Sequence, residues 1–123
     1  MTFANWMVLA AALLPYLTVV LAKWTSSIDN HAARRSMEAL AGWRRRADWA
    51  HRNHFEAFPA FAAAVIIAEL AQGPQHRIDG LAGLFILLRL VYTACYLADW
   101  ATARSITWGL GFFTVLALFV TAA

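Results

Sequence analysis

Three short stretches of an otherwise apolar chain hold polar side chains at spacings that could do chemistry. AHRNHFEAFPAF carries an amide and a carboxylate three residues apart, RLVYTACYL carries a guanidinium and two phenols on one helical face, and an Arg-Ser pair precedes another apolar run. Such groups could bind an anionic polar ligand. Since Ser-His-Asp, Gly-rich phosphate-loop and CxxCH patterns are lacking, catalysis would rest on charge and hydroxyl groups. The residues are Asn53, Glu56, Arg89, Tyr92, Tyr96, Arg104 and Ser105.

A metal site is a competing interpretation of the first stretch. His51 and His54 are three residues apart, a usable spacing for two ligands on a helix. Glu56, however, is five residues from His51 and two from His54, so its side chain is directed away from both. Cys95 is the single cysteine, which excludes an intrachain disulfide and a multi-cysteine metal site. We therefore expect no metal.

The composition indicates a membrane protein. Of the 123 residues, 62% are apolar and 14% are charged, whereas soluble domains are about half apolar and about a quarter charged. A chain of this length cannot hide so much apolar surface in a water-soluble core. The net charge of +3 would suggest nucleic acid in a soluble protein. Here its distribution indicates topology instead, and we expect no nucleic-acid partner.

Four continuous apolar runs predict membrane-spanning helices at about 3–22, 50–71, 78–100 and 104–122. The first run lacks a basic start and a cleavage site, so it is interpreted as a retained helix rather than a signal peptide. Short connections make the last three helices antiparallel neighbours. The expected fold is all-α, an integral membrane four-helix bundle forming a single transmembrane domain over 1–123. Within the long first loop, 36–50 is expected to form a short interfacial helix.

The basic residues predict the orientation of these helices. Eight lysines and arginines flank the side with the first and third loops, and Arg77 alone flanks the other side. Positively charged loops stay in the cytoplasm, so both termini are expected on the non-cytoplasmic side. All the polar groups then fall in the cytoplasmic half of the membrane. The eight are Lys23, Arg34, Arg35, Arg44, Arg45, Arg46, Arg52 and Arg104.

Of these residues, Arg89 is the hardest to explain by packing alone. A helical rise of 1.5 Å per residue places it about 16 Å from the cytoplasmic end of its helix, near mid-membrane. Arginine does not shed its charge, and insertion there costs at least about 2.5–3.5 kcal/mol. Glu56 is the acidic residue at comparable depth on the same side. We therefore expect a contact between Glu56 and Arg89, with Asn53 nearby.

These motifs resemble the MAPEG family, the membrane-associated proteins in eicosanoid and glutathione metabolism. AHRNHFEAFPAF resembles the family's Asn-x-x-Glu followed by a proline, RLVYTACYL resembles its Arg-x-x-Tyr/His-x-x-x-Tyr, and the Arg-Ser pair matches the start of its fourth helix. The motifs lie in three helices, while the order and topology extend the resemblance over all four. Small bacterial members look most similar, which implies a multi-pass protein of the bacterial inner membrane.

The resemblance implies a homotrimer that binds glutathione between neighbouring subunits near the cytoplasmic face, within the lipid bilayer. Arg104 would stabilise the glutathione thiolate with its charge and the helix dipole, and Ser105 would add a hydrogen bond. A lipophilic electrophile would arrive laterally from the bilayer. The residues that carry over as glutathione-binding are Arg52, Asn53, Glu56, Arg89, Tyr92 and Tyr96.

The sequence departs from the family pattern at two tryptophans. Trp49 stands where several relatives carry an arginine, for which Arg46 is a substitute one turn earlier, and Trp108 stands where some carry a tyrosine. The favoured function is a membrane-embedded glutathione-dependent transferase or peroxidase acting on lipophilic electrophiles. The alternatives are a non-catalytic subunit of a larger membrane assembly and a lipid or quinone carrier. The sequence does not identify the electrophile.

Overall fold

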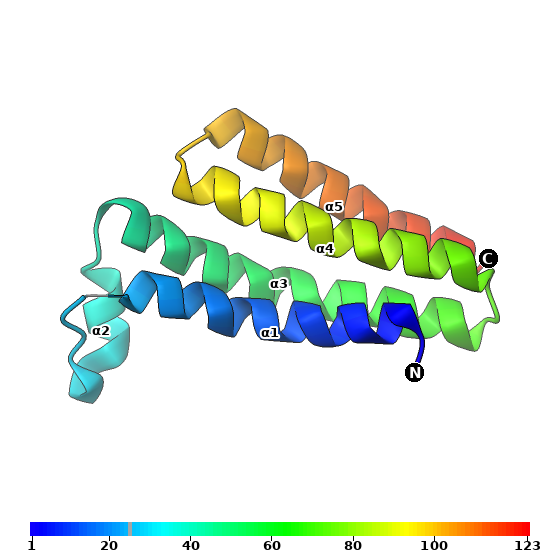
Figure 1. Cartoon of the computed structure of the whole chain (residues 1–123), viewed down its shortest axis with the longest axis horizontal. Coiled ribbons are helices and arrows are strands. Elements are labelled where there is room, and N and C mark those ends of the chain that lie inside the picture. Colours follow the sequence, from blue (N-terminus) through cyan, green and yellow to red (C-terminus); the bar gives the residue numbers. More distant parts are fainter. Residues whose placement is uncertain (25) are drawn as a thin grey trace.

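The computed structural model describes residues 1–24 and 26–123, and all of their regular secondary structure is helical (Figure 1). This confirms the all-α prediction. Within the described residues there are five α-helices and one short 3-10 helix, and no strand. In chain order they are α1 (Phe3–Lys23), η1 (Asn30–Ala32), α2 (Ala33–Glu38), α3 (Gly42–Leu70), α4 (Gln75–Leu97) and α5 (Ala101–Thr121).

Three of the described helices, α1, α4 and α5, are long and apolar enough to cross a membrane. They indicate an integral membrane protein, as the composition predicts. α3 is the longest helix, at 29 residues, but it is not among them. Charged residues along its first half, from Arg44 to Glu56, explain the difference because they lower its hydropathy. Four membrane spans therefore remain a prediction.

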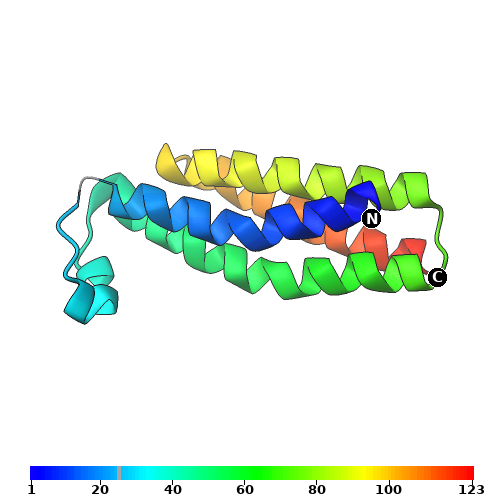
Figure 2. The same ribbon diagram turned by 60° about the horizontal axis from the view of Figure 1, so that its bottom comes forward.

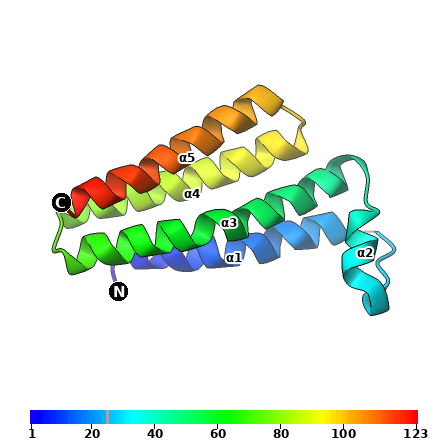
Figure 3. The same cartoon turned by 180° about the vertical axis from the view of Figure 1, so that it is seen from behind.

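The four long helices lie alongside one another as two pairs. α1 packs chiefly on α3 and α4 on α5, while α3 also contacts both α4 and α5. The buried core between them combines large side chains with alanines that let the helices approach closely. At its centre the rings of Phe61 and Phe85 stack, with centroids 4.0 Å apart. Figure 2 and Figure 3 show both termini at one end of the bundle and α2 at the opposite end.

The turn between α3 and α4 fixes how these helices meet. Gln72 adopts a left-handed conformation with φ 57°, and the Gly73 amide donates to the Ala68 carbonyl at 3.0 Å, which closes the end of α3. A Cβ added to Gly73 would lie 2.8 Å from the carbonyl oxygen of Thr121. Glycine is therefore required here because the turn packs directly against the end of α5.

The segment 36–50 does not form the single interfacial helix expected from the sequence. α2 ends at Glu38, and α3 then starts at Gly42, eight residues before the expected start at 50, and continues through the bundle without a break. Gly42 allows the chain to turn between α2 and α3 because its φ is +60°, a conformation that glycine adopts readily. The Arg46 Nη2 donates to the Leu97 carbonyl at 3.1 Å. This bond fastens the extension of α3 to the end of α4, so the extension is part of the bundle.

Candidate functional site

The side chain of Arg89 is buried between α3 and α4, with 3% of its surface exposed. Its Nε and Nη2 donate to His54 Nδ1 at 3.1 and 2.9 Å, and Nη2 also donates to Asn53 Oδ1 at 2.9 Å. Both partners are neutral acceptors. The expected direct contact between Arg89 and Glu56 is wrong, although Asn53 does lie beside Arg89 as expected.

His54 is the residue that sequence reasoning missed as the partner of Arg89. Arginine has only donors, so His54 Nδ1 must accept and the ring is neutral, with its proton on Nε2. That Nε2 donates to Thr93 Oγ1 at 2.9 Å, and the Thr93 hydroxyl donates to the Arg89 carbonyl at 2.9 Å. The three residues thus form a closed ring of hydrogen bonds that ties α3 to α4.

The same bonds separate the two histidines of the metal interpretation. Both ring nitrogens of His54 are engaged within the bundle, by Arg89 and Thr93. His51 lies against α1 instead, where its Nδ1 bonds with the Pro15 carbonyl at 2.6 Å. The two imidazoles therefore hold different helices in place.

A signal for the role of His54 is present in the sequence. The buried positions of α3 include Ala47, Ala50, His54, Phe61 and Ala64, a stripe with steps of three, four and seven residues. This stripe places His54 inward. Glu56, two residues further, falls on the exposed face of the same helix, which is why it does not reach Arg89.

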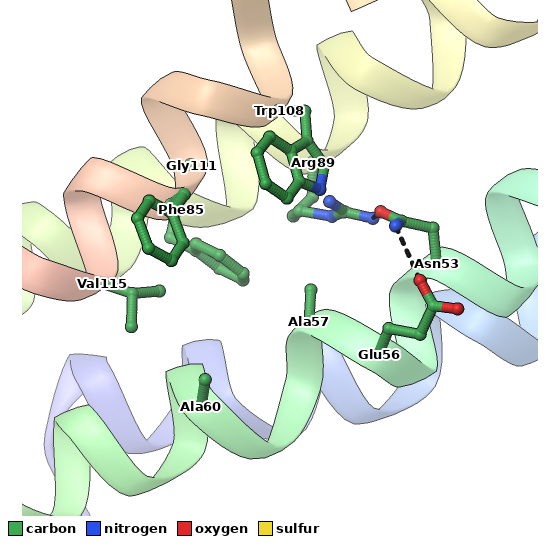
Figure 4. Close-up of a pocket in the computed structure, with 10 residues that line it drawn as sticks. Asn53, Glu56, Ala57, Ala60, Phe85, Arg89, Trp108, Gly111 and Val115 are labelled. Carbon is green, nitrogen blue, oxygen red and sulfur yellow. Dashed lines mark hydrogen bonds between the residues drawn. The ribbon is translucent and has the colours of Figure 1, made fainter. Parts of the chain in front are cut away.

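Asn53 connects Glu56 to Arg89. Its Nδ2 donates to Glu56 Oε2 at 2.9 Å while its Oδ1 accepts from Arg89, as described above. Figure 4 shows the two side chains linked at the edge of a pocket, with Arg89 directed toward Asn53. The Glu56 carboxylate is thus linked to the Arg89 guanidinium through the side-chain amide of Asn53. The other carboxylate oxygen of Glu56 makes no hydrogen bond with the described residues.

Two tyrosines separate Arg89 from a second guanidinium. Arg89 lies over the ring of Tyr92 at 4.4 Å, Tyr92 meets Tyr96 edge to face at 5.5 Å, and Arg104 lies over Tyr96 at 4.5 Å. Tyr96 also neighbours Trp49, whose ring is 6.3 Å away. The side chain of Arg104 makes no hydrogen bond or ion pair within the described part of the chain, so its positive charge is available to a ligand.

The remaining expected residues lie apart from this cluster. Arg52 pairs with the buried Asp48 at 3.0 Å and lines a different groove, beside α2. The Ser105 hydroxyl donates to the Ala101 carbonyl at 3.1 Å on an exposed surface. Arg46, considered as a substitute for the arginine missing at Trp49, is occupied by the Leu97 carbonyl. Within this chain, therefore, Arg52 and Ser105 do not meet Arg89.

A pocket of about 240 Å³ opens between α3, α4 and α5 next to Arg89. Asn53, Glu56 and Arg89 form its polar end, and the rest is apolar. Figure 4 shows Trp108 beside Arg89, with Phe85 and Val115 further along and two alanines of α3 facing them. Sequence reasoning noted Trp108 only as a departure and missed the apolar lining, made of Ala57, Ala60, Phe85, Trp108, Gly111, Phe112 and Val115.

Comparison with known families adds a decisive observation. The model of the MAPEG family matches residues 3–123, essentially the whole chain. The chain belongs to the MAPEG family. No curated protein and no solved structure gives a match. Membership of MAPEG, together with the three apolar helices, makes the chain an integral membrane protein of a family with glutathione-related transferase and peroxidase functions.

Proposed function

We propose that this chain is a membrane-embedded glutathione-dependent transferase or peroxidase that acts on lipophilic electrophiles. The observation that carries the proposal is that the buried charge of Arg89 is paired only with neutral partners. Its guanidinium is buried and bonded to a neutral histidine and a neutral amide, with no carboxylate in direct contact among the described residues. Buried charges normally have a partner of opposite charge. An anionic ligand in the adjoining pocket would supply one.

Glutathione has the groups that such a site needs. It carries two carboxylates, an ammonium group and a thiol. Arg89 Nη1 makes no hydrogen bond with the described residues and can donate to a carboxylate of the ligand. Glu56 is exposed beside it and can accept from the ammonium group. Asn53 holds these two residues at a fixed spacing through its two hydrogen bonds.

Arg104 is the residue we assign to the thiol. It lies in the first turn of α5, where the helix dipole and the guanidinium both favour a negative charge. Thiolate, not thiol, is the nucleophile. The thiolate sulfur would bond to the electrophilic carbon, and a displaced group would leave with the electrons of the broken bond. Cation–π contacts position the two guanidiniums, since Arg89 lies over the ring of Tyr92 and Arg104 over the ring of Tyr96.

The proposed setting is a homotrimer in a bacterial inner membrane, with the site facing the cytoplasm. A neighbouring subunit would bring Arg52 or Ser105 to the ligand, since both are exposed on one subunit. The exposed carboxylate of Glu56 favours such an assembly because lipid is a costly neighbour for a charge. The charge distribution and the family resemblance support this setting.

Substitution of Arg104 tests the proposed role directly. We expect Arg104→Ala to lower the rate of glutathione conjugation by at least about a hundredfold, the loss seen when a main electrostatic stabiliser is removed, while the assembly persists on gel filtration. Arg77→Ala, which removes an exposed arginine at the opposite end of α4, is the matched control and should keep full activity. Unchanged turnover in Arg104→Ala would reject the assignment.

The closed ring of His54, Thr93 and Arg89 supports a second candidate function. Such a ring fixes helix packing without any ligand, as a non-catalytic subunit of a larger membrane assembly would need. Purification distinguishes the two. A free oligomer that binds glutathione supports the enzyme, whereas constant co-purification with another membrane protein and no glutathione binding supports the subunit.

A further inference from the structure

The chain between α1 and the bundle part of α3 folds into a small ordered lobe. Residues 28–45, here called the α2 lobe, comprise η1, α2 and the first residues of α3. Met37 of α2 is buried in a small apolar cluster with residues of α1 and α3. The Arg45 Nε donates to the Leu40 carbonyl at 2.6 Å, which ties the start of α3 to the turn before it. The lobe therefore holds its side chains at fixed places on the bundle.

The α2 lobe projects to one side of the bundle. Figure 1 and Figure 3 show α2 extending past α1, away from α4 and α5. Three exposed tryptophans lie at the same end of the bundle, since Trp24 follows α1, Trp43 is in the first turn of α3 and Trp100 precedes α5. Tryptophans at the ends of spanning helices lie at the headgroup level of a membrane. At this level, the headgroups of the surrounding lipid are within reach of the lobe.

The α2 lobe is basic, and two of its arginines are open to a partner. It holds four arginines against two acidic residues, Asp29 and Glu38. The exposed Arg34 and Arg35 make no hydrogen bond or ion pair with the described residues. They lie in the first turn of α2, where the helix dipole disfavours a positive charge. These two charges therefore do not stabilise their own helix, and they fit a negatively charged partner outside the chain.

Arg44 indicates what kind of partner suits the lobe. Its guanidinium lies over the ring of Trp43, 4.8 Å from the centroid, and its Nε donates to the Trp24 carbonyl at 3.2 Å. Arginine and tryptophan are both amphipathic, with an apolar body and a polar tip, so such a pair suits the boundary between lipid and water. The lobe is therefore matched to a charged lipid surface better than to a polyanion dissolved in water.

We propose that the α2 lobe binds the headgroups of anionic phospholipids in the adjoining leaflet, with Arg34 and Arg35 as the main contacts. The positive-inside rule predicts that this end is cytoplasmic, and the cytoplasmic leaflet has the negative surface potential. Phosphate oxygens of the lipid would accept from the guanidiniums. Each arginine near such a surface raises affinity about fivefold. The proposal does not depend on the glutathione site, because neither arginine lines the pocket beside Arg89.

Lipid-selective quenching of a label on the lobe tests the proposal. The label is a fluorophore on His31→Cys, at an exposed position of η1, while the native Cys95 is buried. The protein is reconstituted in phosphatidylcholine vesicles that contain nitroxide-labelled phosphatidylglycerol or, in parallel, nitroxide-labelled phosphatidylcholine. We expect the phosphatidylglycerol to be preferred at the label by at least about fivefold at low salt. The preference should fall strongly at about 1 M salt, where charges interact over only about 3 Å.

Charge variants show whether the lobe is the source of this preference. Joint replacement by Arg34→Gln and Arg35→Gln should reduce it to at most about twofold, whereas Arg34→Lys with Arg35→Lys should keep most of it because the charge remains. Arg77→Gln, at the opposite end of the bundle, is the matched control and should keep it in full. Equal quenching by the two lipids, or a preference that persists in the glutamine variant, would overturn the proposal. Quenching by neither lipid, as expected if a second copy of the chain covers the lobe, would also overturn it.

Discussion

At the scale of single residues, the site depends on how one buried guanidinium is satisfied. Arg89 donates three hydrogen bonds to His54 and Asn53. Hydrogen bonds to a charged group contribute about 1.5–3 kcal/mol to stability. A buried donor that loses its acceptor costs the full desolvation of that group. His54 should therefore be a stability residue, while Glu56, which is exposed, should act mainly on ligand binding.

Replacement of His54 tests this division. We expect His54→Leu to lower the free energy of unfolding by about 1.5–3 kcal/mol, because it leaves Arg89 without its ring acceptor. Glu56→Gln is expected to change the same quantity by less than about 0.5 kcal/mol, as is usual for exposed positions. Denaturant unfolding of both variants in one detergent gives the comparison. A larger loss in Glu56→Gln than in His54→Leu would point to the direct Glu56–Arg89 contact instead.

At the scale of helices, the turn between α3 and α4 sets the spacing of the bundle. Gly73 lies against the last turn of α5, so the C-terminal end of α3 is packed against the C-terminal end of α5. The side chain of Glu69, just before this turn, accepts from Asn5 Nδ2 at 3.0 Å. The start of α1 is thereby held at the same place. Changes at this turn should therefore affect the whole bundle.

Alanine substitutions at two glycines measure this effect. Gly73→Ala is expected to destabilise the protein by about 1–3 kcal/mol through overpacking, because the added Cβ would lie 2.8 Å from a backbone oxygen. Gly80→Ala meets nothing within 4 Å and should stabilise α4 by about 0.5–1 kcal/mol. Thermal unfolding of the two variants should move in opposite directions. Equal shifts would contradict the tight packing at Gly73.

The helices were more predictable from the sequence than their contacts. Continuous apolar runs locate α1, α4 and α5 to within a few residues because the bilayer requires such runs. The early start of α3 could not be predicted from apolar runs, because this part of the helix carries charged residues. Arg46 fits in the bundle through its hydrogen bond to the Leu97 carbonyl. That bond joins residues far apart in the sequence.

The sequence predicted that Asn53 lies beside Arg89, but it did not predict His54 as the partner of Arg89, and the Arg52 and Ser105 that it grouped with them lie apart. Depth along the helices correctly grouped Asn53 with Arg89, because helical rise and spacing fix these positions. Pairing by opposite charge then selected Glu56, whereas hydrogen-bond geometry selects the neutral His54. The pocket was not predicted, since an empty space arises from small residues on separate helices, such as Ala60 and Gly111.

At the scale of the whole molecule, the two ends of the bundle differ in charge. The arginine-rich segment around α2 lies at one end, and both termini lie at the other (Figure 1). The positive-inside rule predicts that the α2 end faces the cytoplasm. The proposed glutathione site, nearer this end, would then draw on the cytoplasmic pool of the thiol.

Cysteine labelling in intact bacterial cells tests this orientation. The native Cys95 is buried and should not react. We expect Ala123→Cys to be modified by a membrane-impermeant maleimide, and His31→Cys, in η1, to be modified only after the cells are opened. The reverse pattern would place the proposed site on the other side of the membrane.

The central claim is that the cluster around Arg89 binds glutathione. Calorimetric titration of glutathione into the detergent-purified protein tests it most directly. We expect saturable binding that weakens at least tenfold in Glu56→Gln, since the ammonium group loses its charged acceptor, and that stays unchanged in Arg77→Ala. A parent protein that takes up no glutathione, or a Glu56→Gln variant that binds it equally well, would contradict the account.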